Sequence, residues 1–309
     1  MAERFSGGLR ERLRAGSPLL LDAAMGSDLD RRGLATTLPL WSALGLLKRP
    51  DLVKRIHMDN LQAGADIVTT NTFRTTAHTL RVAGLDLARA EELDRLAVGL
   101  AVAAREETKR SEALIAGSIA PLDDCYRPTF ETPLEIALDE HRAQARTLAE
   151  AGVDFIMVET MPTSAEAAIA LRAAVETGLP ATVSFVCAFP GSGAEVRLLS
   201  GETLAEAVAA VEALNPAAIL ANCAAPVVIT AALRELRALT TLPIGGYANV
   251  GHVDEEVGWS PGGGVSGDEY ADEAKRWLAL GARLVGGCCG THPVHTAALR
   301  RLIDSMPGQ

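Results

Sequence analysis

The chain has 309 residues, of which 48% are hydrophobic and 22% are charged, and its formal net charge is −10. This composition provides for a large core and excludes an intrinsically disordered chain. The negative charge argues against nucleic acid or an anionic membrane surface as the main partner. Five cysteines, an odd number in a long chain without an export signal, indicate a reducing compartment and no disulfide framework.

The N-terminal region is basic and lacks an apolar stretch, so it is not expected to be a signal peptide. One uncharged run, residues 214–233, is long enough to span a bilayer. It contains Pro216, Pro226 and two asparagines, and therefore predicts a strand, a turn and a helix instead. We expect a cytoplasmic protein whose partners are small molecules, with no nucleic acid and no membrane. The sequence leaves open whether it forms a homo-oligomer.

Short apolar runs alternate with longer amphipathic runs along the whole chain. The apolar runs predict eight strands, at residues 19–25, 66–72, 113–120, 155–160, 181–187, 218–224, 242–248 and 283–289. Helical patterns lie between them, and several helices are expected to end at a glycine shortly before the next strand, as at Gly64, Gly152 and Gly281. Near-continuous apolar strands separated by helices are typical of a parallel sheet that is buried on both faces.

Eight strand–helix units predict an α/β protein with a single (β/α)8 TIM barrel domain that spans residues 1–309, with a core of about 18–303. A doubly wound open sheet is the alternative. The glycine-rich stretch 258–270 is expected to be a loop. It has no phosphate-loop spacing and no lysine, so it gives little support to nucleotide binding.

Polar residues interrupt the apolar runs at their C-terminal ends, where a barrel carries its active site. They are Asp22, Asn71, Thr72, Ser118, Glu159, Thr160, Asn222, Cys223, Asn249 and the pair Cys288–Cys289. Because one strand separates the sixth and eighth strands of a barrel, Cys223 and the pair can converge across its mouth. Three thiolates there would bind Zn²⁺ and leave a fourth tetrahedral position for water or substrate.

The adjacent cysteines need an explanation, because neighbours on a straight strand point to opposite faces. Glycines on both sides, at 286, 287 and 290, would allow the backbone to bend until both sulfurs face the same way. A redox pair is the alternative, although adjacent cysteines form a strained disulfide and lack the usual two-residue spacing. Cys125 and Cys187 are expected to be core residues.

The two acidic residues at strand ends each follow an apolar run. Asp22 and Glu159 would be costly to bury without a cationic or hydrogen-bonding partner. Binding of a ligand ammonium group and structural ion pairing therefore both remain open. The histidines at 57, 292 and 295 are expected to pack or to cap helices rather than to bind metal.

Six segments together resemble one family, and the resemblance runs from about Pro18 to Ile303. They are LDAAMGSDL, AGADIVTTNTF, GSIAP, GVDFIMVETMP, ILANCA and GGCCGT. This set resembles the homocysteine S-methyltransferases, zinc-dependent barrels that methylate homocysteine to methionine. The resemblance implies that Cys223, Cys288 and Cys289 hold the zinc.

The resemblance also implies a set of substrate-binding residues. Asp22 and Glu159 would hold the homocysteine amino group, and the backbone at Met25 and Gly26, with Thr72, would receive its carboxylate. Asn222, in the NC element, and Trp41, near the substrates, are expected to join them. The family often has glycine where Ala23 stands, so the acceptor could be a relative of homocysteine such as its selenium analogue.

Members of the family differ in their methyl donor. The folate route needs additional domains, so we expect a sulfonium donor, S-methylmethionine or S-adenosylmethionine, with betaine as the second choice. Trp41 is the candidate for facing the donor cation. Two other classes remain as alternatives: a zinc-binding protein without catalysis, and a metal-free barrel that acts on a phosphorylated ligand.

Overall fold

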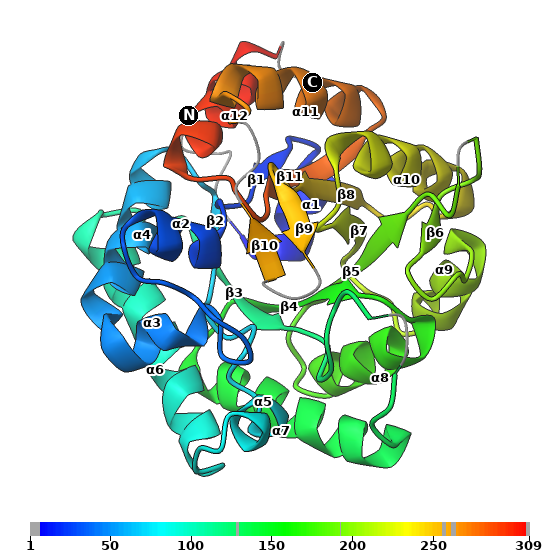
Figure 1. Ribbon diagram of the computed structural model, residues 1–309. Coiled ribbons are helices and arrows are strands. Elements are labelled where there is room, and N and C mark those ends of the chain that lie inside the picture. The colour runs from blue at the N-terminus through cyan, green and yellow to red at the C-terminus, as the bar shows by residue number, and fades with distance from the viewer. Residues whose placement is uncertain (1–6, 128–129, 192, 255–257, 261–263, 307–309) are drawn as a thin grey trace.

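The computed structural model describes residues 7–306 apart from 128–129, 192, 255–257 and 261–263. Eight parallel strands form a ring at the centre of the molecule, and helices surround them (Figure 1). Around the ring the strands are β1 (Leu19–Leu20), β11 (Ala282–Gly287), β8 (Ile244–Ala248), β7 (Ala218–Asn222), β5 (Ala181–Ala188), β4 (Phe155–Met161), β3 (Leu114–Ile119) and β2 (Ile67–Thr69).

The ring closes between its first and last strands. β1 pairs in parallel with β11, Leu19 opposite Leu284, and Leu21 forms an isolated parallel bridge with Ile67 at the start of β2. The N–H of Asp22 donates to the carbonyl of Ile67 at 3.0 Å. The predicted (β/α)8 barrel is therefore confirmed, and the open-sheet alternative is wrong.

The barrel strands are apolar on both faces, which explains their near-continuous apolar runs. Phe155 and Met157 of β4 point into the barrel, where they join one cluster of buried side chains. Ile156 and Val158 alternate with them and pack against the surrounding helices in a second cluster. Burial on both faces of a parallel sheet is the rule when helices cover the outside.

Twelve helices are present in the described chain. They are α1 (Leu9–Ala15), α2 (Met25–Arg31), α3 (Ala43–Lys48), α4 (Pro50–Gln62), α5 (Ala77–Val82), α6 (Arg89–Glu107), α7 (Leu134–Ala151), α8 (Ser164–Val175), α9 (Leu204–Glu212), α10 (Pro226–Leu239), α11 (Gly267–Ala279) and α12 (Pro293–Ser305). Three of the predicted glycine stops are confirmed, because Gly64, Gly152 and Gly281 have φ values of +104°, +96° and +89°.

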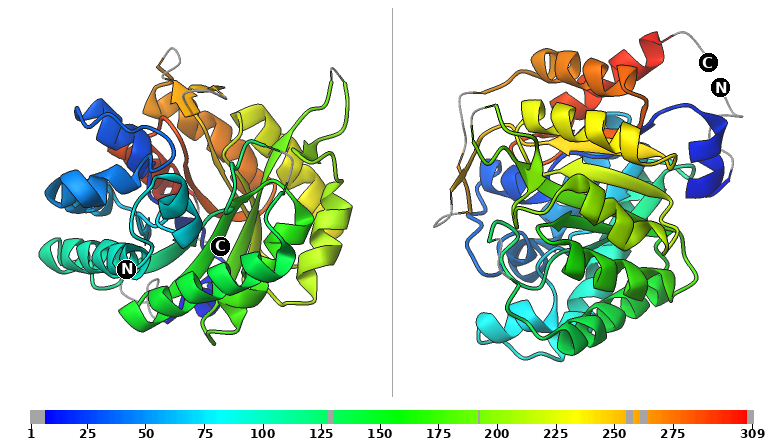
Figure 2. Two further views of the ribbon diagram at one scale, coloured as in Figure 1. Left: turned by 60° about the horizontal axis from the view of Figure 1, so that its bottom comes forward. Right: turned by 90° about the vertical axis from the view of Figure 1, so that its right-hand side faces the viewer.

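The first helix closes one end of the barrel. Leu9 and Leu13 of α1 are buried in the same cluster as Leu19 and Leu114, which stand at the starts of β1 and β3. Figure 2 shows α1 and the strands β9 (His252–Asp254) and β10 (Gly258–Ser260) at opposite ends of the barrel. The carboxyl ends of the strands are consequently left for the functional site.

Two sequence predictions are wrong in detail. Residues 19–25 are not one strand, because β1 ends at Leu20 and α2 begins at Met25. Residues 258–270 are not all loop: β10 pairs antiparallel with β9, and α11 begins at Gly267, while residues 261–263 lie outside the described residues. Backbone hydrogen bonds hold the glycine-rich strand β10 against β9, so the side-chain pattern of this stretch does not predict a strand.

The uncharged run 214–233 is confirmed as a strand, a turn and a helix, since it contains β7 and most of α10. Within the described part of the chain, no helix combines the length and the apolar character needed to cross a bilayer.

One buried hydroxyl connects the outer layer to the strand ends. The Oη of Tyr270, on α11, lies 2.9 Å from the backbone nitrogen of Ala248, and 2.7 Å from the carbonyl oxygen of Gly286. Tyr270 is fully buried, with its ring edge-on to Trp277. It therefore ties α11 to the ends of β8 and β11.

We expect Tyr270→Phe to lower the free energy of unfolding by about 1–3 kcal/mol, because buried backbone groups at both strand ends lose their partner. Urea unfolding followed by circular dichroism measures the change. Val82→Ala, at a site that is 63% exposed, is the control and should stay within about 0.5 kcal/mol of the parent. Equal stability of Tyr270→Phe and the parent would show that this hydroxyl does not hold the strand ends.

Candidate metal and substrate site

A cavity lies at the carboxyl ends of the barrel strands. Residues at or just after the ends of β1, β2, β4, β7, β8 and β11 line it, together with Trp41 and the segment 125–126. The cavity therefore lies where the sequence placed the active site. Cys223, Cys288, Cys289, Asp22 and Glu159 all contribute to its wall.

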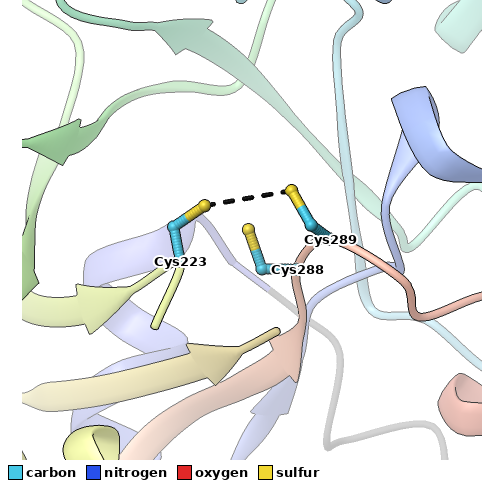
Figure 3. Close-up of side chains that lie close together, drawn as sticks. All are labelled: Cys223, Cys288 and Cys289. Atoms are coloured by element: carbon cyan, nitrogen blue, oxygen red, sulfur yellow. Dashed lines mark hydrogen bonds between the residues drawn. The ribbon is translucent and has the colours of Figure 1, made fainter. Parts of the chain in front are cut away.

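The three predicted cysteines come together in this cavity. Their sulfurs lie within 4.8 Å of one another, and the Sγ atoms of Cys223 and Cys289 are 3.9 Å apart. Figure 3 shows the three side chains directed toward a common point, one from the end of β7 and two from the end of β11. Five free cysteines are present, so none of these thiols is consumed in a disulfide. The cluster is a candidate metal centre.

Backbone hydrogen bonds hold the cysteine-bearing segments to one another. Cys223 donates to the carbonyl of Tyr247 at 3.1 Å, and Cys288 donates to that of Ala248 at 2.9 Å. Val250 donates to the carbonyl of Cys289 at 2.8 Å. The end of β8 therefore lies between the segment that carries Cys223 and the segment that carries Cys288 and Cys289, and its backbone hydrogen bonds align the two segments. Cys223 itself has a φ of +57°, in the left-handed region that non-glycine residues seldom adopt.

The glycines around the cysteine pair have two different roles. Gly290 has a φ of +83° and supports the turn after Cys289. Gly286 and Gly287 remain in β11, where an added Cβ would collide with Leu21 and with Thr291 respectively. The expectation that all three glycines bend the backbone is therefore wrong for two of them, which provide space for close packing.

The two predicted carboxylates are buried and hydrogen-bonded on the same cavity. Asp22 accepts from both the N–H and the hydroxyl of Thr69, each at 2.9 Å. Glu159 accepts from the hydroxyl of Ser118 at 2.5 Å and from that of Tyr247 at 3.0 Å. These bonds fix the direction of each carboxylate toward the cavity.

Burial raises the pKa of Asp22 to about 7, although its hydrogen bonds with Thr69 oppose this and the charge of Glu159 adds to it. Burial likewise raises the pKa of Glu159 to about 7, against the hydrogen bonds from Ser118 and Tyr247. No lysine or arginine lines the described cavity, and neither carboxylate forms an ion pair with a described residue. The structure therefore gives no support to structural ion pairing, and both carboxylates lack a cationic partner.

The start of α2 provides the cavity with backbone donors. Met25 and Gly26 are its first residues and line the cavity, and the preceding Ala24 provides no side-chain cap. The first N–H groups of a helix have no partner within the helix. A Cβ on Gly26 would lie 3.0 Å from Cε2 of Trp41, so glycine allows the indole to rest on this helix.

Two of the predicted substrate residues do not line the cavity. The hydroxyl of Thr72 donates to the carbonyl of Ser118 at 2.7 Å. Asn222 accepts from the N–H of Thr160 at 3.1 Å and donates to its hydroxyl at 2.7 Å. Thr160 has a φ of +61°, so Asn222 holds a left-handed residue next to Glu159. Thr72 and Asn222 therefore lie outside the cavity lining and hold the backbone of two lining residues, Ser118 and Thr160, in place.

The structure adds residues that the sequence did not assign to the site. Phe73 lies edge-on to Trp41, with ring centroids 6.2 Å apart, and Tyr126 places its hydroxyl 2.9 Å from the Sγ of Cys223. Asn71 also lines the cavity, and its buried Oδ1 has no hydrogen-bond partner among the described residues. The position of Asn71 could be predicted from the sequence, because it is a polar residue at a strand end. The position of Tyr126 could not, because it lies in a loop without periodicity.

The remaining expectations concern cysteines and histidines. Cys187 is buried away from the cavity, as expected, whereas Cys125 is buried in the cavity wall beside Tyr126. The predicted packing role fits His57, which is fully buried with its pKa lowered to about 4 by burial. The predicted capping role fits His295, whose Nδ1 accepts from the N–H of His292 at 3.2 Å at the start of α12, whereas the side chain of His292 makes no cap hydrogen bond. None of the three histidines lines the cavity.

The fold and the site together define an α/β-barrel enzyme with a candidate metal centre. Residues 19–303 match the family model described as homocysteine S-methyltransferase. Homocysteine S-methyltransferase 1 of Arabidopsis thaliana is 33% identical over 93% of this chain and 94% of its own length. A selenocysteine Se-methyltransferase of Brassica oleracea is 29% identical over 94% of this chain and 90% of its own length.

Among solved structures, the metallated form of the Escherichia coli homocysteine methyltransferase MmuM superposes with a TM-score of 0.80. It is 33% identical in sequence, and the match covers 95% of this chain and 99% of that one. The chain therefore belongs to the homocysteine S-methyltransferase family.

The raised pKa of Asp22 predicts how stability depends on pH. The folded carboxyl keeps its proton up to about pH 7, while the unfolded one loses it near pH 4, so stability falls as pH rises between these values. Between pH 5.5 and 8.5, the free energy of unfolding should fall by about 2 kcal/mol less in Asp22→Asn than in the parent. Urea unfolding of the ligand-free proteins measures this difference. Ser305→Ala, at the exposed end of α12, is the control. The same pH dependence in Asp22→Asn and the parent would contradict this burial effect.

Proposed function

We propose that this chain transfers a methyl group from a sulfonium donor to the sulfur of homocysteine, with Zn²⁺ held by Cys223, Cys288 and Cys289. One observation carries the proposal: a three-sulfur cluster and two carboxylates without cationic partners share one cavity. The cluster fits a metal and the carboxylates fit the ammonium group of an amino acid. The family membership agrees with both.

The spacing of the sulfurs is compatible with zinc. Tetrahedral zinc with Zn–S bonds of about 2.3 Å places two sulfur ligands about 3.8 Å apart. The Cys223–Cys289 separation of 3.9 Å agrees with this value. Thiolates also favour zinc over magnesium or calcium, and three protein ligands leave one position for the acceptor sulfur.

The carboxylates account for recognition of the acceptor. Asp22 and Glu159 would each accept a charge-assisted hydrogen bond from the amino group of homocysteine, and its positive charge would favour their ionised forms. The N–H groups of Met25 and Gly26 would receive its carboxylate at the start of α2. Homocysteine would then be held by its amino group and its carboxylate, and its sulfur would be free to approach the three cysteines.

Zinc bound there would keep the acceptor sulfur as a thiolate at neutral pH, where a free thiol is mostly protonated. The acceptor sulfur forms a bond to the methyl carbon while the bond between that carbon and the donor sulfur breaks. The donor leaves as a neutral thioether, so no acid is required to assist it. The role of the cavity is to hold both substrates in line and exclude water.

The character of the cavity favours a positively charged donor. Trp41, Phe73 and Tyr126 line it, and aromatic faces attract onium groups. The absence of lysine and arginine from the described lining disfavours a phosphorylated ligand, which would require cations. We therefore place S-methylmethionine or S-adenosylmethionine first and betaine second.

Selenium compounds are the second candidate acceptors. Ala23 lines the cavity and is 6% exposed, so the wall of the site carries a methyl group at a position where the family often has glycine. A relative named for methylation of selenocysteine also matches nearly the whole chain. Selenohomocysteine and selenocysteine should therefore be tested beside homocysteine.

Metal analysis and turnover test this proposal. We expect the parent to bind one zinc per chain and to form methionine from homocysteine and S-methylmethionine. Zinc content and methionine formation should both fall to a small fraction of the parent values in Cys223→Ala, Cys288→Ala and Cys289→Ala, because two sulfurs cannot complete the site. Cys187→Ala, at a buried cysteine away from the cavity, is the matched control and should keep both. Tight zinc binding with no turnover on any donor would identify a metal-binding protein without catalysis.

The donor is tested by comparing Michaelis constants. Trp41→Ala should raise the KM for the donor about fivefold or more, since a cation facing an aromatic ring gains about 1 kcal/mol or more when desolvated. The KM for homocysteine should change less. Methionine formation is measured in parallel with S-methylmethionine, S-adenosylmethionine, betaine and methyltetrahydrofolate. Preference for betaine would replace the first choice of donor, and turnover with methyltetrahydrofolate alone would contradict the leaving-group argument.

A further inference from the structure

The loop that follows β3 brings one hydroxyl group to one of the three sulfurs. The Oη of Tyr126 lies 2.9 Å from the Sγ of Cys223, inside the cavity. Among the described residues, no hydroxyl group makes the equivalent contact with the sulfur of Cys288 or Cys289. The three sulfurs of the cluster are therefore not equivalent.

Two buried contacts on the outer side fix the start of this loop. The N–H of Leu122 donates to Glu166 of α8 at 2.8 Å, and Glu166 lies 3.3 Å from Nε2 of His141 on α7. Glu166 and His141 are both almost completely buried. The loop therefore begins from a rigid base between two helices.

Two further contacts hold the next residue of the loop, Asp123. Its carbonyl accepts from Nη1 of Arg74 at 3.2 Å, and its carboxylate lies 3.3 Å from Nε2 of His78. Arg74 is itself buried and lies over the ring of Phe73. The position of Tyr126, three residues further on, is therefore determined by contacts that do not involve the sulfurs.

The chemistry of a metal ligand decides the direction of the hydrogen bond. A cysteine that binds zinc does so as a thiolate, which has no proton to donate. The hydroxyl of Tyr126 must then be the donor. A hydrogen bond to a metal-bound sulfur withdraws charge from it and fixes its orientation, and such outer contacts commonly change metal affinity 10–100-fold.

We propose that Tyr126 is a positioning residue that donates a hydrogen bond to the Cys223 thiolate, orients this sulfur toward the metal and lowers its electron donation. The inference rests on the metal site of the proposed function. Its consequence is an unequal set of ligands: Cys223 donates less charge than Cys288 and Cys289, and its left-handed backbone is supported from the cavity side.

Cobalt substitution tests the inference, because charge transfer from thiolate to Co²⁺ gives an absorption band whose energy reports the charge on sulfur. In Tyr126→Phe, the band should move to longer wavelength, since the thiolate becomes more electron-rich. Zinc affinity, measured by competition with a chelator, should fall about tenfold. Tyr247→Phe is the matched control, because its hydroxyl donates to Glu159 and to no cysteine. It should keep the band of the parent.

The outcomes separate this inference from the proposed function. If the parent binds Co²⁺ without any thiolate band, the metal site itself is wrong. If the parent shows the band and Tyr126→Phe shows the same band and the same zinc affinity, only the role of Tyr126 is overturned. An equal shift in Tyr247→Phe also overturns it.

A second variant is used if circular dichroism shows that Tyr126→Phe does not fold. Arg74→Met keeps the tyrosine but removes the contact with Asp123. A shift to longer wavelength in this variant supports the inference, and an unchanged band overturns it.

Discussion

The register of three neighbouring parallel strands is the constraint on which the site depends. Asn222 of β7 lies opposite Tyr247 of β8, and Gly287 of β11 lies opposite Ala248. The residues that follow each strand therefore reach the same height, which brings the sulfurs of Cys223 and Cys289 to 3.9 Å. A slip of one residue in a single strand would turn its end to the opposite face and separate the cluster.

Burial of two carboxyl groups in the same site costs free energy, and bound cations can offset this cost. Asp22 and Glu159 are 7% exposed each and lack a cationic partner in the described cavity. Three cysteines nearby would add negative charge on binding a metal as thiolates. Hydrogen bonds from Thr69, Ser118 and Tyr247 recover part of the cost of burial. A metal cation and an ammonium group would recover more, so we expect binding of both to stabilise the fold.

Side chains that never touch the cavity determine much of its geometry. Asn222 holds the left-handed Thr160, and Tyr270 holds the ends of β8 and β11. The family resemblance implies that Thr72 and Asn222 bind the substrate, yet neither side chain lines the cavity. Each turns its side chain into the wall instead, Thr72 to the carbonyl of Ser118 and Asn222 to Thr160, while the next residue along the chain, Phe73 or Cys223, lines the cavity. A pattern read along the chain locates the strand end but not the side that each residue faces.

The sequence by itself determined the barrel, because apolar runs buried on two faces and alternating with helices admit few other arrangements. It also identified the three cysteines and two carboxylates, since polar residues at the ends of such strands are informative. Only the tertiary structure decided the place of Tyr126 beside Cys223, because its loop has no periodicity and is held by Glu166 and Arg74, which are distant in sequence. Contacts of this kind depend on how separate segments meet in space, and no local pattern in the chain encodes them.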